Sequence, residues 1–199
     1  MSEPTVFLVD DDPAVLRSLS ALVKVVFPRV EAFRSAHEFL QAYEPGQPGC
    51  LVLDVAMPGM NGLELQRRLI DNRCDLPIIF VTGHANVQMA VGAMQNGAVN
   101  FLEKPFREHD LWESVRKAME MDERNRRRLD RRHLVEERLA SLSDGERHVL
   151  DMILDGKPNK EIATELELSI RTVEDRRSRL MRKMGAGSLA ELIQLAMTH

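Results

Sequence analysis

Short runs of apolar residues alternate with amphipathic stretches through the first part of the chain. Four runs are almost continuously apolar, as strands buried on both faces of a sheet should be, and cover residues 6–9, 51–53, 78–81 and 99–102. Residues 29–33 predict a fifth strand, at an edge. Signals for helix starts between the strands are Asp12 before Pro13, Ser35 three residues before Glu38, and Asn61 three residues before Glu64. The pattern predicts an α/β domain of (βα)5 order, with a parallel five-stranded sheet.

The periodicity changes to one long helical stretch after Glu108. Apolar residues repeat at helical spacing over residues 111–119 and lead into an arginine-rich segment. Sustained heptads are absent there, so a solvated linker helix is favoured over a coiled coil. The predicted divisions are a first domain at residues 1–121, a charged helical linker at residues 122–141 and a second domain at residues 142–199.

Capping and turn signals divide the second domain into four short helices. Ser143 and Glu146 form a capping box, and Asn159 is placed to cap the next helix. Gly185 ends the third helix, predicted at residues 170–184. One face of that helix carries the apolar residues Ile170, Val173, Leu180, Met181 and Met184. The domain is therefore predicted to be all-α.

Length and composition narrow the class of protein. A chain of 199 residues, 44% of them apolar, can build two small cores. No apolar run approaches the roughly 20 residues of a membrane span, and the N-terminus lacks the basic region of a signal peptide. We therefore expect a soluble, cytoplasmic protein that does not bind membranes. Cys50 and Cys74 lack metal-ligand spacing and are expected to be small apolar residues rather than a disulfide.

The net charge of −4 is divided unevenly along the chain. Residues 1–121 hold 11 Lys and Arg against 16 Asp and Glu, residues 122–142 hold 7 against 5, and residues 143–199 hold 9 against 10. Within this last part, residues 169–187 carry six basic side chains against Glu174 and Asp175. Such a local positive charge favours contact with nucleic acid.

Polar side chains follow the predicted strands of the first domain. These residues are Asp10, Asp11 and Asp12 after the first strand, Asp54 after the third, Thr82 at the end of the fourth and Lys104 after the fifth. Ligands of parallel sheets bind at this edge, so the side chains should converge there. Clustered carboxylates are tolerated when a hard cation neutralises them, and oxygen ligands favour Mg²⁺.

Phosphoryl transfer is the chemistry that this cluster suits. Asp54 can act as a nucleophile and form an aspartyl phosphate, while Mg²⁺ and Lys104 balance the charge of the transferring oxygens. Thr82 would donate its hydroxyl group to a phosphate oxygen. Taken singly, the aspartates could be simple helix caps and Lys104 an ordinary loop residue.

The first domain resembles the receiver domain of two-component response regulators across residues 4–121. The resemblance rests on Val9-Asp10-Asp11, Asp54-Val55-Ala56-Met57-Pro58-Gly59-Met60-Asn61-Gly62, Val81-Thr82-Gly83-His84 and Glu103-Lys104-Pro105-Phe106. It implies a flavodoxin-like fold for the parallel five-stranded sheet, and it implies that Asp54 is the phosphoacceptor. It also implies that Asp11, Asp54 and the Ala56 carbonyl group hold Mg²⁺, with Asp10 supporting through water. The resemblance further implies a cis Lys104–Pro105 bond and a switch that couples Thr82 to Phe101, for which a plain core role is the alternative.

Residues 159–178 have the spacing of a helix-turn-helix, although Glu167 stands where many such turns use glycine. The polar face of the second helix suits phosphate contact and base reading, with a solvated charged face as the alternative.

Residues 142–197 resemble the LuxR-type domain of the NarL/FixJ regulators, and they are closest to the FixJ branch. The motifs that carry this resemblance are Leu142-Ser143-x-x-Glu146, Asn159-Lys160-Glu161-Ile162-Ala163, Thr172-Val173-Glu174 and Lys183-Met184. The residues predicted to bind DNA are Lys160, Arg171, Thr172, Glu174, Asp175, Arg176, Ser178, Arg179 and Arg182.

Together the resemblances imply a two-component response regulator that a sensor histidine kinase phosphorylates on Asp54. Phosphorylation is expected to produce a homodimer that binds promoter DNA and acts with RNA polymerase as an activator. One alternative is an aspartate-nucleophile phosphatase, which is disfavoured because Ala56 stands where a second acid would protonate a leaving group. The other is a DNA binder that does not depend on phosphorylation. The protein is not expected to be an enzyme.

Overall fold

The computed structural model describes residues 3–83 and 86–197. The chain divides into two compact units, Met1–Arg126 and Arg127–His199. Cys50 is buried, Cys74 is partly buried, and both are free thiols. In the described ranges, no helix combines the length and the apolar character that crossing a membrane requires.

The first unit is built on a parallel sheet, as predicted. Its strands are β1 (Thr5–Val9), β2 (Val30–Phe33), β3 (Gly49–Leu53), β4 (Ile78–Thr82) and β5 (Asn100–Glu103). They lie in the order β2-β1-β3-β4-β5, and every neighbouring pair is parallel. Strands β1, β3 and β4 are buried along their whole length, which explains why their sequences are continuously apolar. The predicted ends differ from the observed ones by at most two residues.

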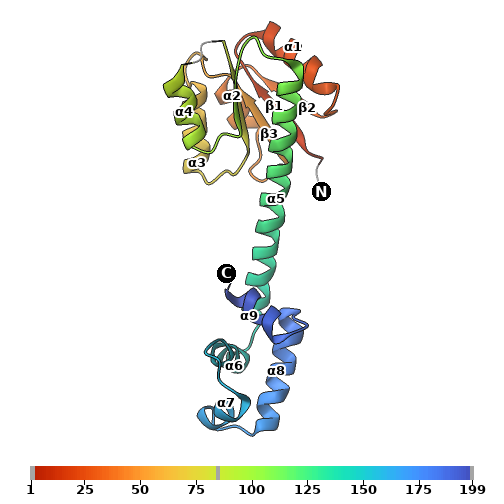
Figure 1. The fold of residues 1–199 in the computed structure, drawn as a ribbon, viewed down its shortest axis with the longest axis vertical. Helices are drawn as coiled ribbons and strands as arrows, with labels where there is room; N and C mark the ends of the chain where they lie inside the picture. Colours follow the sequence, from red (N-terminus) through yellow and green to blue (C-terminus); the bar gives the residue numbers. More distant parts are fainter. Residues whose placement is uncertain (1–2, 84–85, 198–199) are drawn as a thin grey trace. The chain divides into compact units, whose positions relative to one another are not determined.

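Helices cover both faces of this sheet (Figure 1). They are α1 (Pro13–Lys24), α2 (Ala36–Ala42), α3 (Gly62–Asp71), α4 (Val87–Gln95) and α5 (Glu108–Ala140). Leu19 of α1 and Val115 of α5 pack in the core on one face. Phe39 of α2, Leu65 of α3 and Ala93 of α4 pack in the core on the other. This alternation makes the predicted (βα)5 unit with a separate core on each side of the sheet.

The predicted helix starts are confirmed by their hydrogen bonds. The Asp12 carboxylate accepts from the backbone N–H of Ala14, and the Ser35 hydroxyl group accepts from that of Glu38. Asn61 and Glu64 form a reciprocal capping box. These bonds satisfy amide groups that would otherwise lack partners at the start of each helix.

The long helix α5 continues from the first unit into the second. In the first unit, the buried Asp122 carboxylate accepts from the backbone N–H of Gly49 (3.1 Å) and from Arg126 Nε (2.8 Å). In the second unit, Val135 is buried in the core and Leu139 packs against it. The linker is therefore helical, as predicted, but contacts of its own anchor each end.

The second unit is all-α, as predicted. Its helices are α6 (Asp144–Leu154), α7 (Asn159–Glu165), α8 (Ile170–Met184) and α9 (Leu189–Met197). Val149, Ile162, Val173, Leu180 and Leu192 form its core with residues from the end of α5. Ser143 and Glu146 make the predicted capping box, and Gly185 ends α8 with a left-handed backbone.

Two details of this unit differ from the sequence prediction. Asn159 does not cap α7: Pro158 is the N-cap residue, and the Asn159 side chain instead accepts a hydrogen bond from Arg177 of α8. Ile170 was predicted on the buried face of α8, but 48% of it is exposed. It lies at the first position of the helix, before the packed region that begins with Val173.

The turn between α7 and α8 holds a non-glycine residue in the left-handed region, since Glu167 has a φ of +54°. For a residue with a Cβ atom, this conformation costs roughly 1–2 kcal/mol relative to the right-handed helical conformation. Part of the gain from glycine is cancelled because glycine gives the unfolded chain more freedom. We expect Glu167→Gly to raise the free energy of unfolding of the second unit by up to about 1 kcal/mol. Glu167→Ala, which retains the strain, should give no such gain in chemical denaturation, and an equal gain would contradict the strain argument.

Candidate functional site

The carboxyl ends of β1 and β3 hold two buried aspartates that share one lysine. Lys104 Nζ lies 2.8 Å from Asp10 Oδ2 and 3.3 Å from Asp54 Oδ1. Asp10 is 3% exposed and Asp54 is 8% exposed. Strands β1 and β3 are neighbours although β2 lies between them in the sequence, so this is the point where strand order reverses. The structure thus brings together three of the residues that the sequence predicted would converge.

Backbone geometry fixes the orientation of both aspartates. The backbone N–H of Ala56 donates to Asp54 Oδ2 (2.7 Å), and that of Asp12 donates to Asp10 Oδ1 (2.9 Å). Gly62 lies so close to Asp54 that a Cβ atom at position 62 would be 2.2 Å from the Asp54 carbonyl oxygen. Each carboxylate is therefore held by its own loop, and the start of α3 packs directly on Asp54.

Burial and charge act in opposite directions on the site. Burial raises the pKa of Asp54 and Asp10 adds to the rise, whereas Lys104 and the Ala56 N–H lower it; the net shift is upward. Burial also acts to lower the pKa of Lys104, but its contacts with Asp10 and Asp54 outweigh burial and raise it. Two buried carboxylates against one ammonium group leave a negative charge uncompensated. A further cation is therefore compatible with the site.

The other residues predicted to bind the metal are at the surface. Asp11 and Ala56 are exposed, and within the described residues the Asp11 carboxylate has no hydrogen bond or ion pair. In the same ranges, no group of three or more His, Cys, Asp or Glu side chains gathers where it could hold a metal ion. The donors near Lys104 are oxygen atoms only, which matches the preference of Mg²⁺.

The predicted switch residues lie on adjacent strands. Thr82 is fully buried at the end of β4, and its carbonyl oxygen accepts from the backbone N–H of Lys104 (2.8 Å). Phe101 of β5 is partly buried, with its ring centroid 5.8 Å from that of Phe80. The Lys104–Pro105 bond is cis, as the resemblance implied. His84, part of the motif around Thr82, lies outside the described residues.

The exposed face of α8 collects most of the residues predicted to bind DNA. Those exposed on this helix are Arg171, Glu174, Asp175, Ser178, Arg179 and Arg182. Their spacing of three or four residues puts them on one side of the helix, opposite Val173, Leu180 and Met184 in the core. Lys160 of α7 is exposed as well. Thr172 is partly buried, and its hydroxyl group lies 2.8 Å from that of Ser169 at the helix start.

Three basic residues of α8 lie off this face and hold the unit together. The Arg176 guanidinium lies against Gly145 of α6, where an added Cβ atom would be 2.7 Å from Arg176 Nη1. Arg177 donates to the Asn159 side chain on α7. Lys183 Nζ donates to Glu146 Oε2 (2.7 Å) and to the Ser141 carbonyl oxygen (2.8 Å). The exposed face of α8 therefore carries a smaller net positive charge than the count over residues 169–187 suggested.

Comparison with known families assigns both units. The sequence model of the response regulator receiver domain matches residues 6–116, more than half of the chain. The model of the luxR family of bacterial regulatory proteins matches residues 140–196. The chain is a response regulator with a LuxR-type domain. A receiver domain implies a histidine kinase as partner and generally binds Mg²⁺ at its phosphorylation site, and a LuxR-type domain implies DNA binding.

Relatives match the regulator over both units. Response regulator protein TodT of Pseudomonas putida is 42% identical over 190 residues, covering 96% of this chain and 84% of TodT. Transcriptional regulatory protein FixJ of Rhizobium meliloti is 40% identical over 197 residues, covering 99% and 97% of the two chains. Among solved structures, response regulator StyR has a TM-score of 0.90 at 39% identity with full coverage of both chains. Full-length FixJ from B. japonicum has a TM-score of 0.59 at 40% identity, covering 99% of this chain and 97% of FixJ. The predicted membership of a FixJ-like family is confirmed.

Asp122, the buried carboxylate that anchors α5, was not predicted from the sequence of the regulator. The signal was present, because Asp122 continues the spacing of Leu111, Val115 and Ala118, all of which are fully buried. It was read as part of the charged linker because aspartate is almost never fully buried unless it is paired. Its partners, Gly49 and Arg126, became visible only in the folded unit.

The ion pair between Glu146 and Lys183 makes the regulator's second unit sensitive to acid. The hydrogen bond from Lys183 is the largest of the effects that lower the pKa of Glu146 to about 2, and the hydrogen bond from the Ser143 backbone is the next. A carboxyl group whose pKa is lowered by folding stabilises the fold above its ordinary pKa of 4.5, and this stabilisation is lost as the pH falls towards 2. We expect Glu146→Gln to weaken the unit at neutral pH and to reduce its loss of stability between these two pH values.

Hydrogen exchange of α6 and α8, corrected for intrinsic rates, would measure this effect. Glu161→Gln removes an exposed carboxylate from α7 and serves as the matched control. An acid dependence in Glu146→Gln equal to that of the wild type would refute the assignment.

Proposed function

We propose that phosphorylation of Asp54 by a sensor histidine kinase controls dimerisation and sequence-specific DNA binding by this regulator. The observation that carries the proposal is the pair of buried carboxylates, Asp10 and Asp54, around the Lys104 ammonium group. It lies at the sheet edge where ligands of parallel α/β folds bind. A DNA-binding unit on the same chain gives the modification an output.

In the proposed transfer, the Asp54 carboxylate attacks phosphorus and the bond to the donor's leaving atom breaks. Lys104, already paired with both aspartates, balances the charge on the transferring oxygens. Thr82 would donate its hydroxyl group to a phosphate oxygen, and Phe101 would follow its movement by packing alone. The aspartyl phosphate would carry a charge of about −1.5 to −2 in place of the single charge of the carboxylate, and it would add phosphate oxygens that accept hydrogen bonds. These changes would supply the free-energy difference between the two states.

Mg²⁺ would be held by Asp11, Asp54 and the Ala56 carbonyl group, with Asp10 in support. The uncompensated charge beside Lys104 and the all-oxygen donors are compatible with this ion. When bound, Mg²⁺ would neutralise negative charge on the phosphoryl group.

The output that we propose is activation of transcription in the cytoplasm by a dimer bound to promoter DNA with RNA polymerase. Arg171, Arg179 and Arg182 would contact phosphates, whereas Glu174, Asp175 and Ser178 would read bases. Lys160 and Thr172 would support these contacts. Arg176 belongs to the proposed set with a smaller role, because its guanidinium lies against α6.

We further propose that the regulator has no phosphatase turnover of its own. The position two residues after Asp54 is Ala56, so the site lacks the second acid that would protonate a leaving group. Hydrolysis of p-nitrophenyl phosphate that depends on Asp54 would argue for an enzyme instead.

Beryllofluoride with Mg²⁺, which mimics an aspartyl phosphate, tests the proposal. It should shift the protein from monomer to dimer in sedimentation and tighten binding to DNA selected from the genome. Asp11→Ala should abolish both responses. Asp12→Ala is the matched control, because it removes a neighbouring carboxylate that caps α1, costs about 1 kcal/mol of stability and should leave the responses intact. An unchanged monomer fraction in the wild type would count against the proposed switch.

A further inference from the structure

One face of the linker helix α5 carries a continuous set of exposed arginines. This arginine face consists of Arg124, Arg127, Arg128, Arg131 and Arg132, all of which are exposed. At about 100° per residue these five positions fall within about 140° of the helix circumference and span about 12 Å along it. Glu123, Asp130 and Glu136 fall outside this arc. Arg126, which lies between the first two of these positions in the sequence, points to the opposite side, where it donates to Asp122.

We propose that the arginine face of α5 binds the phosphate backbone of DNA beside the sequence that α8 reads. This inference rests on DNA binding by the second unit. It adds a contact surface outside the helix-turn-helix, with a sequence-independent role.

The position of the arginine face favours a partner that the second unit also touches. Four of the five arginines belong to that unit, which begins at Arg127. The same side of the helix continues to Val135, which is buried in the core of the second unit. One turn later, Arg138 Nη1 donates to the carbonyl oxygen of Met184 at the end of α8 (2.6 Å). Helix α5 is therefore tied directly to the proposed recognition helix.

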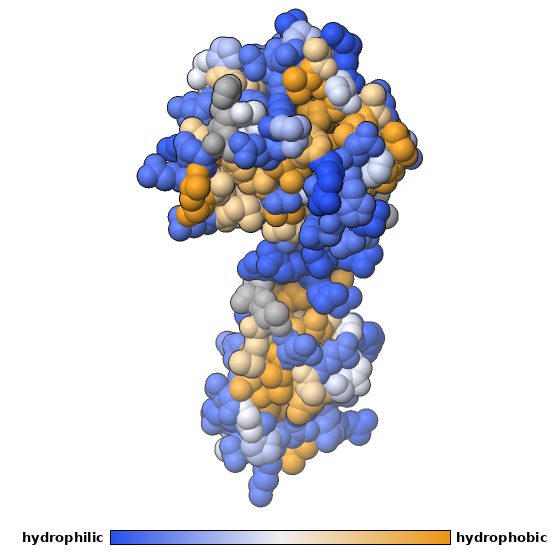
Figure 2. All heavy atoms as spheres, turned by 45° about the horizontal axis from the view of Figure 1, so that its top comes forward, coloured by the Kyte–Doolittle hydropathy of each residue, from blue (hydrophilic) through white to orange (hydrophobic). Residues whose placement is uncertain are grey.

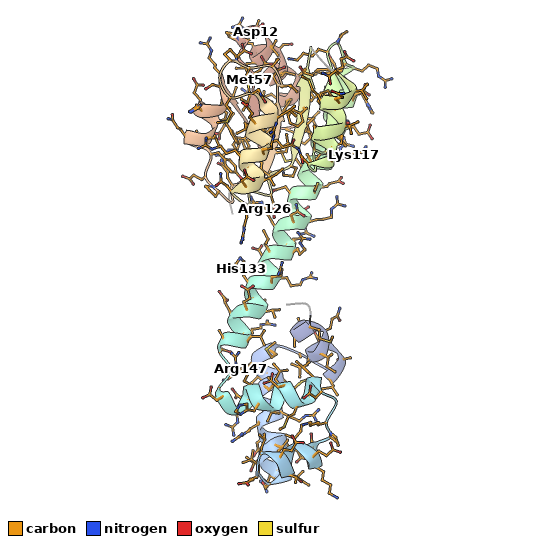
Figure 3. All side chains as sticks on the ribbon, turned by 90° about the vertical axis from the view of Figure 1, so that its left-hand side faces the viewer. Asp12, Met57, Lys117, Arg126, His133 and Arg147 are labelled. Atoms are coloured by element: carbon orange, nitrogen blue, oxygen red, sulfur yellow. The ribbon has the colours of Figure 1, made fainter. Side chains whose placement is uncertain are left out.

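The chemistry of the face favours phosphate groups. Guanidinium groups bind phosphate oxygens in a bidentate manner and are always charged. DNA presents about one charge per 1.7 Å of its axis, so a row of about 12 Å can meet several phosphates. An anionic membrane surface fits less well, because a helix that lies in a membrane needs a broad apolar face. Arg126 and His133 lie on the opposite side of this stretch (Figure 3). The exposed residues Leu129 and Leu134 are about 140° apart around the helix, so they do not form one apolar face. Hydrophilic residues predominate on the visible side of the middle of α5 (Figure 2).

The test is the salt dependence of binding to duplexes of random sequence, measured with the full-length protein. The linker variant, Arg128→Gln/Arg131→Gln/Arg132→Gln, removes three positive charges and replaces the arginines with glutamine, which is also a good helix former. If each arginine meets one phosphate, the slope of log K against log salt should become shallower by about 0.9 per contact. The affinity should fall on random and selected duplexes alike, by about tenfold or more at low salt.

A second triple variant controls for the change in net charge. Arg67→Gln/Arg68→Gln/Arg116→Gln removes three exposed arginines from the first unit and should retain the wild-type slope. Circular dichroism should show the same helix content in both variants.

The outcomes separate this inference from the proposed function. A wild-type slope in the linker variant, with normal DNA binding, would overturn the inference alone. Equal losses in the two triple variants would also overturn it, because the effect would then come from net charge. Tighter binding of wild-type protein to vesicles of anionic phospholipid than to DNA, lost in the linker variant, would assign the face to membranes instead. Wild-type protein that binds no DNA would contradict the proposed function itself.

Discussion

Asp54→Ala is expected to abolish every response of the regulator to a phosphodonor or to beryllofluoride. The variant removes the only carboxylate that is proposed to accept the phosphoryl group, while Lys104 keeps its contact with Asp10 at 2.8 Å. The proposed DNA face on α8 lies in a different compact unit and should be unaffected. We therefore expect a complete loss of induced dimerisation with normal affinity for random duplexes.

Stability measurements distinguish this loss from misfolding. Because burial raises the pKa of Asp54, folding disfavours its charged form, and the charge weakens the fold at neutral pH. The isosteric variant Asp54→Asn removes that charge, so its free energy of unfolding should not fall below that of the wild type. If a phosphodonor still increased the DNA affinity of Asp54→Ala, this result would contradict the proposed switch.

A fragment of the chain and the Asp54→Ala variant then distinguish how the receiver acts on the output. If the receiver represses the second unit, residues 127–199 alone should bind DNA more tightly than the unphosphorylated full-length protein. If it acts by dimerisation, this fragment should bind about as well as Asp54→Ala and more weakly than the phosphorylated protein. We favour dimerisation, because the exposed surface of the linker is mainly charged.

Gly62→Ala is expected to be the most damaging single-methyl change near the site. The added Cβ atom would lie 2.2 Å from the Asp54 carbonyl oxygen and 3.1 Å from Leu53 Cγ, so the backbone of β3 or α3 must move. Overpacking of this kind costs typically about 1–3 kcal/mol, and the contact with backbone favours the upper end. The same movement should displace the Asp54 carboxylate and weaken beryllofluoride binding.

The first unit offers a reporter and a matched control for this experiment. Trp112, the single tryptophan of the sequence, donates from its indole N–H to the Leu22 carbonyl oxygen and reports unfolding of that unit by fluorescence. Gly92→Ala adds the same methyl group inside helix α4, where nothing lies within 4 Å. It should stabilise the helix by about 0.5–1 kcal/mol. Equal destabilisation by the two substitutions would show that the contact with Asp54 is not the cause.

Local pattern was sufficient to predict the elements of this regulator and the convergence of three of its site residues. The apolar runs of β1, β3 and β4 are continuous because both faces of those strands are buried, so their existence and parallel pairing could be read directly. Asp10, Asp54 and Lys104 could be predicted to converge because each directly follows a strand, and the carboxyl ends of parallel strands share one edge. Helix α8 was predicted to its observed ends because its apolar residues repeat at helical spacing and Gly185 is a local stop signal, whereas its N-cap residue, Ser169, was found only in the structure.

Only the tertiary structure decided how polar residues with more than one available partner are used. Asn159 has the side chain of a cap but accepts from Arg177, and Arg176 has the position of a DNA contact but lies against Gly145. Asp122 has the composition of a linker residue but is buried against Gly49, 73 positions earlier in the sequence. Sequence periodicity assigns a residue to a face of its own helix. The partner that meets this face is set by long-range packing, because a buried charge or amide must find a hydrogen bond wherever the fold supplies one.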